Sequence, residues 1–328
     1  MSDTATLSRL FASIEPDLER VDRMFEERAF SGLDMLNAAA EHALSSPGKR
    51  LRTALTLLAG KLIDYRIEKL LPLSVAFEMV HLATLIHDDI IDHAATRRGI
   101  PTVNARYGDR VAILLGDYLF AKTAGLIADV EDFRIDHLFS ETVASVCEGT
   151  IIELLSVRKF DLSLEMYLER ITRKTAVLMA ACCKGGATVG AGTDAQIALL
   201  EDYGRNLGVA FQIMDDVLDY RGTTASIGKP IGNDFRQGLI TLPLIYAIEQ
   251  DSDGRATWVE EMLRSAEVTD QEVSEVVAWV RAGPALEQAQ ELAQRYGMRA
   301  RALLTEFPAS PERAVLEQLV DFVIARTH

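Results

Sequence analysis

The sequence contains few of the residues that interrupt helices. Its 328 residues include only 9 prolines and 21 glycines. Proline removes a backbone donor and glycine costs helix stability, so this scarcity favours long helices over many short strands joined by turns. An all-β fold is therefore excluded. Hydrophobic residues make up 48% of the chain and charged residues 25%. These values exclude a disordered or collagen-like chain.

Cysteine is also scarce. The chain has three cysteines, Cys147, Cys182 and Cys183, and two of them are adjacent. An odd count with this spacing cannot form a disulfide framework, and it fits a protein of the reducing cytoplasm.

Long apolar runs and positive charge are missing as well. No stretch approaches the run of about 20 apolar residues that spans a bilayer, and the start MSDTATLSRL lacks the features of a secretory signal. We therefore expect a cytoplasmic protein with no stable membrane insertion. The net charge of −15 disfavours nucleic acid as a partner, because phosphate binding relies on basic surface. Any anionic substrate must be bound by locally gathered cations.

Apolar residues recur at helical spacing over nearly the whole chain, as at Leu51, Leu55, Leu58 and Leu62. We expect breaks at residues 45–48, around Pro72, and at 94–109, 185–194, 221–238 and 251–254. None of these is a long or low-complexity linker. The pattern predicts a single all-α domain over residues 1–328, built from about a dozen helices.

One heptad pattern occurs twice in the chain. Residues 86–92 read IHDDIID and residues 213–219 read IMDDVLD. On a helix, the three aspartates of each heptad share one side within about 6 Å of axial rise. Such charges repel one another, and the macrodipole at a helix C-terminus adds up to ~1 kcal/mol per charge. A hard cation such as Mg²⁺ would neutralise them, since it takes one or two carboxylates together with water and phosphate oxygens.

A solvated acidic helix end would explain one such motif alone. Both motifs, however, follow strongly apolar segments, residues 77–86 and 207–214, which we expect in a core. Two copies in this setting favour a site. We expect the motifs to face each other and to hold several Mg²⁺ ions around one diphosphate. The predicted metal ligands are Asp88, Asp89, Asp92, Asp215, Asp216 and Asp219.

Cationic and polar residues lie close to both motifs. The segment GKRLR at residues 48–52 opens a helix, where Lys49, Arg52 and backbone N–H groups could bind an anion. Each candidate has an ordinary interpretation by itself, as a surface arginine or a core histidine. Together they indicate two anionic ligands. The candidates are Lys49, Arg52, His81, Arg97, Arg98, Lys174, Thr175, Gln212 and Lys229.

These motifs resemble those of the all-trans isoprenyl diphosphate synthases, also called polyprenyl synthetases. That family carries DDxxD followed by RRG, as at residues 88–92 and 97–99, and FQxxDDxxD, as at residues 211–219. The segments GKRLR (48–52), KT (174–175), GKP (228–230) and GLITLP (238–243) follow in the family order. The resemblance covers residues 48–245.

The resemblance implies a bundle of long antiparallel helices around a deep central cavity, usually in a homodimer. It also implies an Mg²⁺-dependent prenyltransferase that uses about three ions. Four residues match the site for isopentenyl diphosphate: Lys49, Arg52, His81 and Arg98. Five match contacts to the allylic diphosphate: Arg97, Lys174, Thr175, Gln212 and Lys229. The matching catalytic residues are Asp88, Asp89, Asp92, Lys174, Asp215 and Asp216. Asp88, Asp92 and Asp215 match the residues most directly tied to Mg²⁺.

The chemistry of this family agrees with the residues. The metal neutralises charge on the diphosphate as the allylic C–O bond breaks. The double bond of isopentenyl diphosphate attacks the allylic cation, and a proton is then lost to the departing pyrophosphate. Water must be excluded, so an apolar chamber is expected.

Several alternatives remain open from the residues alone. A terpene cyclase or a squalene-type synthase carries different aspartate motifs and no GKRLR, and a non-catalytic subunit is expected to lose carboxylates. The chain departs from the family at three positions, where Glu, Gln and Lys are common in place of Thr150, Glu153 and Leu239.

The helix that leads to the first motif bears on product length. Short-chain members commonly carry a ring near the positions of Ala83 and Thr84, and here both residues and Val80 lack one. The first ring on this face is Phe77, about 16 Å deeper. We predict products longer than geranylgeranyl diphosphate, in the hexaprenyl to octaprenyl range, with a short-chain farnesyl or geranylgeranyl enzyme as the alternative. Phe77 could instead only pack a neighbouring helix, and Tyr118 and Phe120 could also close the tunnel.

Overall fold

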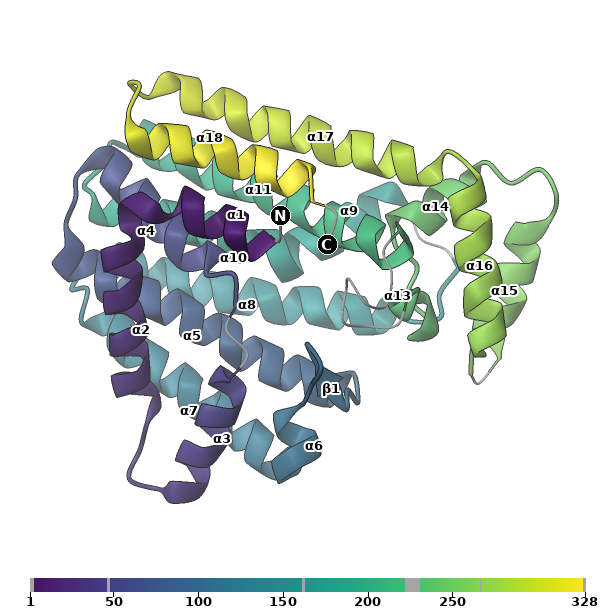
Figure 1. Ribbon diagram of the computed structural model, residues 1–328, viewed down its shortest axis with the longest axis horizontal. Coiled ribbons are helices and arrows are strands. Elements are labelled where there is room, and N and C mark those ends of the chain that lie inside the picture. The colour runs from purple at the N-terminus through teal and green to yellow at the C-terminus, as the bar shows by residue number, and fades with distance from the viewer. Residues whose placement is uncertain (1–2, 46–47, 161–162, 222–230, 266, 327–328) are drawn as a thin grey trace. The chain divides into compact units, whose positions relative to one another are not determined.

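The chain folds almost entirely into α-helices, as expected. The computed structural model describes residues 3–45, 48–160, 163–221, 231–265 and 267–326 (Figure 1). In these ranges the strands form one short ribbon, β1 (Thr96–Arg97) paired antiparallel with β2 (Ile100–Pro101). Helices outnumber the expected dozen, because short ones such as α6 (Val103–Tyr107) and α13 (Asn233–Arg236) interrupt the segments that we took as loops.

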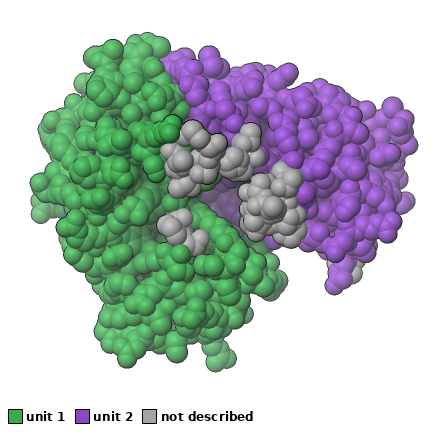
Figure 2. All heavy atoms as spheres, viewed as in Figure 1, with its two compact units in different colours: residues 1–143, 178–204, 303–319 green, residues 144–177, 205–302, 320–328 purple. Residues whose placement is uncertain are grey.

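The chain divides into two compact units, each assembled from three stretches of sequence (Figure 2). Unit 1 contains residues 1–143, 178–204 and 303–319, and unit 2 contains residues 144–177, 205–302 and 320–328. Helix α8 (Phe133–Ser156) runs from the first unit into the second. The single-domain interpretation stays a prediction.

Unit 1 is built around helix α5 (Ile67–Ile91), which packs against α7 (Asp109–Ala128), α4 (Leu51–Ile63) and α2 (Glu15–Ala29). Leu73, Phe77 and Ala83 of α5 are completely buried. The unit also contains α1 (Asp3–Leu10), η1 (Ala12–Ile14), α3 (Asp34–Leu44), α6, most of α10 (Val177–Val189) and η3 (Leu304–Glu306). Helices α4 and α10 touch backbone to backbone, because a Cβ on Gly186 would lie 2.3 Å from the carbonyl oxygen of Thr56.

Unit 2 encloses its own apolar core. Tyr167, Val217, Tyr220 and Phe235 are completely buried in it. The unit contains α9 (Leu164–Ile171), the π-helical turn η2 (Thr172–Ala176), the larger part of α11 (Asp194–Arg221), α13, α14 (Leu242–Glu249), α15 (Arg255–Arg264), α16 (Asp270–Ala282), most of α17 (Ala285–Leu303) and the end of α18 (Pro311–Ile324).

One expected break is wrong, and another begins later in the chain than expected. Helix α5 continues through Pro72, whose neighbours Leu71 and Leu73 are buried. Proline in a helix interior costs about 3 kcal/mol, which the burial of adjacent leucines offsets at roughly 1.5–3 kcal/mol each. The break expected at residues 185–194 begins only after Val189, where α10 ends. A Cβ on Gly185 would lie 3.1 Å from the ring of Phe77, so α10 packs closely against α5 at this glycine.

Two helices among the described residues, α5 and α7, are long and apolar enough to cross a bilayer by length and composition alone. The expectation that no stretch approaches this length is therefore wrong, because a helix tolerates a few charged residues among its apolar ones. The apolar window of α5 is 67% buried inside the protein, as a core helix would be. That of α7 is only 39% buried, so much of its apolar surface is exposed.

Candidate active site

The first aspartate motif closes helix α5. Asp88 and Asp89 lie in its last turn, and Asp92 is the C-cap, whose backbone N–H donates to the carbonyl oxygen of Asp88 at 2.8 Å. The three side chains differ in exposure: Asp88 is half-buried, Asp89 is 5% exposed and Asp92 is exposed. Asp89 accepts a hydrogen bond from Arg97 Nε at 2.8 Å. Its buried charge is therefore compensated within the protein.

The RRG segment forms a tight hairpin directly after this motif. Arg97 ends β1, and the turn to β2 is made by Arg98 and Gly99, whose φ angles are +50° and +80°. Two positive φ angles at the central residues define a type I′ turn, which favours glycine at one of them. The turn fixes Arg97 near Asp89 and places Arg98 at the tip. Arg97 was predicted to contact the allylic diphosphate, and in this structure it is paired with Asp89.

The residues predicted to bind isopentenyl diphosphate gather within unit 1. Arg52 lies in the first turn of α4, and His81 lies two turns before the first motif on α5. Burial, followed by the positive charges of Arg52, Arg98 and Arg97, holds the pKa of His81 well below its usual value. His81 is therefore a neutral hydrogen-bonding group beside three guanidinium groups. Lys49 precedes the helix by two residues.

A carboxylate accompanies this cationic cluster. Glu78 accepts a hydrogen bond from Thr53 Oγ1 at 3.1 Å. Its negative charge also attracts the guanidinium group of Arg98. Partial burial, followed by Arg97, lowers the pKa of Arg98, and Glu78 opposes that shift.

The second aspartate motif lies near the end of α11, one turn before its last residue. Asp215 is the most open of the three aspartates, with 38% of its side chain exposed, whereas Asp216 is 3% exposed. Tyr167 Oη donates to Asp216 Oδ2 at 2.7 Å, and Gln212 Nε2 donates to Asp216 Oδ1 at 2.9 Å. Burial raises the pKa of Asp216 to about 7, although both hydrogen bonds oppose the shift. Each oxygen of Asp216 is thus engaged by a protein donor.

This hydrogen-bonded chain reaches the predicted allylic site. Thr175 Oγ1 donates to Gln212 Oε1 at 2.9 Å, so Tyr167, Asp216, Gln212 and Thr175 form one continuous series. The structure brings Thr175 and Gln212 together as the sequence predicted. Tyr167 was not predicted, because nothing in the sequence places α9 behind α11.

Asp219 has a different role from the other two aspartates of its motif. Its carboxylate oxygens accept from the backbone N–H groups of Asn233 at 3.1 Å and Asp234 at 3.3 Å. These groups belong to the first turn of α13, which begins after Gly232 at φ +68°. Asp219 therefore ties the helix end to the chain that follows. The predicted substrate residue Lys229 lies outside the described residues.

Lys174 and Thr175 lie in the π-helical turn η2. Such turns are rare and occur frequently at functional sites. Lys174 forms an ion pair with Glu153 of α8, one of the positions where the chain departs from the family pattern. Gly149 of α8 touches the same turn, since a Cβ there would lie 2.4 Å from the backbone nitrogen of Lys174.

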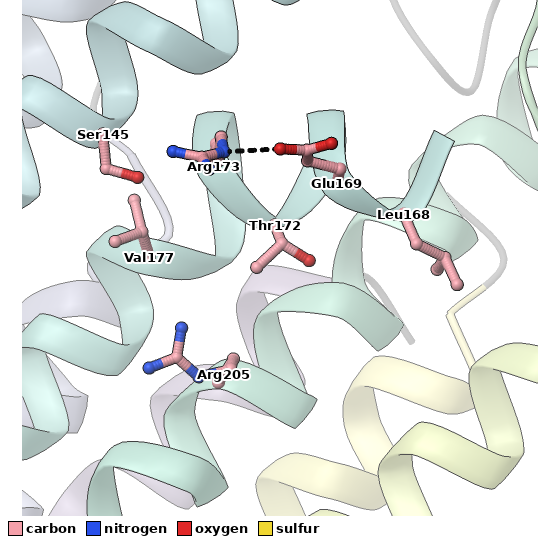
Figure 3. Close-up of a pocket in the computed structure, with 7 residues that line it drawn as sticks. All are labelled: Ser145, Leu168, Glu169, Thr172, Arg173, Val177 and Arg205. Carbon is pink, nitrogen blue, oxygen red and sulfur yellow. Dashed lines mark hydrogen bonds and ion pairs between the residues drawn. The ribbon is translucent and has the colours of Figure 1, made fainter. Parts of the chain in front are cut away.

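An open hollow of about 420 Å³ lies beside this turn in unit 2 (Figure 3). Arg173 lines it and is paired with Glu169 at 3.1 Å. None of the predicted substrate residues that the structure describes lines it. The lining residues are Ser145, Leu168, Glu169, Thr172, Arg173, Val177 and Arg205.

The aspartates fit a hard metal ion that shares its coordination with a ligand. Among the residues that the structure describes, no three His, Cys, Asp or Glu side chains form a complete metal cage. Mg²⁺ does not require one, because it takes one or two carboxylates and completes its octahedron with water and phosphate oxygens. Asp88 and Asp215 begin their motifs at the helix surface, while Asp89 and Asp216 are held by protein donors.

Arg326 was also not predicted, because it lies far from every motif in the sequence. It forms an ion pair with Asp215 Oδ1, and its guanidinium carbon lies 4.3 Å from the ring centroid of Phe211. Phe211 and Asp215 are four residues apart on α11 and therefore share one face of the helix.

Comparisons with known proteins identify the family of this chain. The polyprenyl synthetase family model matches residues 33–280. The chain is 35% identical to heptaprenyl diphosphate synthase component 2 of Geobacillus stearothermophilus, over 98% of this chain and 99% of the relative. A polyprenyl synthase from Caulobacter crescentus, solved with calcium and isoprenyl diphosphate, superposes with a TM-score of 0.95 at 35% identity, over 98% of each chain. A decaprenyl diphosphate synthase from Rhodobacter capsulatus superposes with a TM-score of 0.92 at 32% identity, over 98% of this chain and 99% of the other.

The family match covers most of the chain, and both aspartate motifs, the RRG hairpin and the KT turn lie within it. This chain belongs to the polyprenyl synthetase family and is a prenyltransferase.

Proposed function

We propose that this enzyme condenses isopentenyl diphosphate head-to-tail with an allylic diphosphate to give an all-trans polyprenyl diphosphate, and that it requires Mg²⁺. One observation carries the proposal. In both motifs the second aspartate is buried and held by protein donors, whereas the first is more open and lies at the helix surface. When the second aspartate is fixed by protein hydrogen bonds, the helix turn that carries the first, more exposed aspartate is fixed with it. The first aspartate can then be oriented toward a metal-bound diphosphate.

In this proposal the cationic cluster of unit 1 binds isopentenyl diphosphate. Lys49, Arg52 and Arg98 supply positive charge to a chain whose net charge is −15. Neutral His81 supplies a hydrogen bond without a further charge, because its lowered pKa leaves the imidazole unprotonated at neutral pH.

The allylic diphosphate is assigned to Lys174, Thr175, Gln212, Lys229 and Arg97. When bound at the aspartates, Mg²⁺ supplies Lewis-acid stabilisation of the diphosphate leaving group. Lys174 adds positive charge to the same leaving group, and Gln212 is oriented for contact by Thr175 and Asp216. The metal ligands are assigned to Asp88, Asp92 and Asp215, with Asp89, Asp216 and Asp219 behind them.

The product is assigned to the medium- and long-chain class. The relatives described above, named for heptaprenyl and decaprenyl products, support this assignment. Ala83 and Val80 leave the helix below the first motif without a ring. Phe77 is completely buried against Gly185 of α10, so in this structure it packs a neighbouring helix. Tyr118 is tied by its hydroxyl to the carbonyl oxygen of Phe30 at 2.9 Å.

A homodimer is supported by exposed apolar side chains in each unit. Ile113 and Leu114 of α7 are 45% and 64% exposed. Ile151, Leu154 and Leu155 of α8 are at least 46% exposed and share one helix face. Rows of this kind mark interaction surfaces. Light scattering of the purified chain should give twice the monomer mass, and Leu114→Glu should shift it toward the monomer.

The decisive experiment is incubation of the purified chain with isopentenyl diphosphate and either farnesyl or geranylgeranyl diphosphate, with Mg²⁺ or with EDTA. Chromatography of the dephosphorylated products should show chains longer than geranylgeranyl with Mg²⁺ and none with EDTA. A product that stops at farnesyl would contradict the length assignment. Inactivity of the chain alone would favour a subunit that needs a partner. Ala83→Phe should shorten the products if α5 lines the tunnel.

A further inference from the structure

The end of the chain places a cation on the second aspartate motif. Arg326 follows α18 and is 8% exposed, and one nitrogen, Nη2, is paired with Asp215 Oδ1. Its guanidinium group lies over the ring of Phe211. The cation is therefore held from two sides by residues one turn apart on α11.

The pairing is incomplete on the arginine side. Arg326 Nε and Nη1 are buried and have no hydrogen-bond partner among the residues that the structure describes. A buried donor without a partner costs free energy, and the cost is greater when the group is charged. The ring of Phe211 offsets part of it through a cation–π contact. The guanidinium group is therefore bound at Asp215 less favourably than a fully paired buried arginine would be.

The carboxylate, in contrast, is open on its other side. Asp215 has 38% of its side chain exposed, whereas only 6% of the Arg326 side chain is exposed. A hydrated cation can therefore approach Asp215 from solvent, while Asp215 is the one acidic partner of Arg326 in the described part of the chain. Two cations that require the same carboxylate oxygen compete for it, so each lowers the apparent affinity of the other.

We propose that Arg326 is an internal counter-ion of the second aspartate motif, and that a divalent cation displaces it from Asp215 Oδ1 on binding. The inference rests on the proposed function, which makes Asp215 a metal ligand. Displacement frees Arg326 from α11, so metal binding loosens the segment that follows α18. The pair also keeps Asp215 neutralised while no metal is bound, which removes the repulsion between neighbouring aspartates.

The test is the binding of Mn²⁺ alone to the full chain, followed by electron paramagnetic resonance of the free ion. Arg326→Gln should tighten the Asp215-dependent Mn²⁺ affinity about tenfold, since it removes a charge-assisted pair worth roughly that factor. Arg326→Lys keeps the charge and should stay close to wild type. Arg301→Gln is the matched control, because Arg301 is also paired with an aspartate, Asp321, within unit 2 and should leave the affinity unchanged.

A second measurement uses only the wild-type chain. Amide hydrogen exchange at residues 320–326 should become faster when Mn²⁺ is added. Equal or weaker Mn²⁺ affinity in Arg326→Gln, or unchanged exchange at saturating Mn²⁺, would overturn the displacement. If Asp215→Asn leaves Mn²⁺ binding of every form unaltered, the metal assignment of the proposed function fails, and the displacement fails with it.

Discussion

The two aspartate motifs have the same sequence pattern and different surroundings. In the first, the buried Asp89 is neutralised by an arginine from the hairpin that directly follows. In the second, the buried Asp216 is held by two neutral donors, Tyr167 and Gln212, from α9 and α11. The third aspartates differ too, since Asp92 ends its helix in solvent and Asp219 anchors the start of α13. One motif is thus supported locally and the other by distant segments of chain.

The largest expected effect falls on the first aspartate of each motif. Asp88→Asn and Asp215→Asn should each lower turnover by about 10²–10³-fold or more, because each removes a charge that stabilises the leaving group through the metal. Steady-state rates at saturating Mg²⁺ would measure this, with circular dichroism to confirm the helical fold. Asp253→Asn, in an exposed loop, is the control. Near-normal turnover in either variant would mean that the motifs are not equivalent metal sites.

The next effect separates the two substrate sites. Lys49→Ala or Arg52→Ala should raise the KM for isopentenyl diphosphate about tenfold or more, with a smaller change for the allylic primer, since each removes a cation from one pocket. Lys174→Ala should show the opposite preference. Initial rates with one substrate varied and the other saturating would measure both. A reversed pattern would mean that the two substrates are assigned to the wrong sites.

A smaller effect tests the uncharged hydrogen-bond donors that hold Asp216 in the second motif. Tyr167→Phe removes a buried donor from Asp216 and should cost about 1–3 kcal/mol of the free energy of unfolding, together with a several-fold loss of turnover. Tyr65→Phe is the control for the loss of a tyrosine–aspartate hydrogen bond alone. Tyr65 donates to Asp17 at 2.6 Å and is 42% exposed, so its loss should cost less stability and leave turnover unchanged. Denaturant unfolding and steady-state rates would measure the pair of variants. Unchanged turnover in Tyr167→Phe, whatever its cost in stability, would show that Tyr167 only stabilises the fold.

The smallest effect concerns pH. The pKa of His81 is lowered in the folded chain, so the unfolded chain binds the extra proton. Above the unfolded pKa of about 6.5, His81 is neutral in both the folded and the unfolded chain. As the pH falls below that value, only the unfolded chain takes up the proton, so the free energy of unfolding decreases. His81→Gln should therefore reduce the drop in melting temperature between pH 7.5 and 5.5 by a few degrees. The exposed His137→Gln should leave that drop unchanged.

Much of the fold and of the first motif could be predicted from the sequence because the determinants are local. Helical periodicity gave the helix class, and Asp89, Arg97, Arg98 and Gly99 lie within eleven residues. The break at Pro72 was predicted wrongly because tertiary burial outweighs a local penalty. Tyr167 and Arg326 could not be found, since their contacts with Asp216 and Asp215 join residues 49 and 111 positions apart. The pairing of Lys174 with Glu153 escaped for the same reason.

The close approach at Gly149 bears on the proposed role of Lys174, although Gly149 itself has no side chain to offer a substrate. Helix α8 lies so close to η2 that any side chain at Gly149 would meet the backbone nitrogen of Lys174. A substitution there must push the turn away, and the lysine amine moves with it. A saturation mutagenesis screen scored by growth would therefore rank Gly149 with the charged residues of the site, and its variants would not be rescued by added substrate. Natural variation among relatives should likewise be confined at this position to the smallest residue.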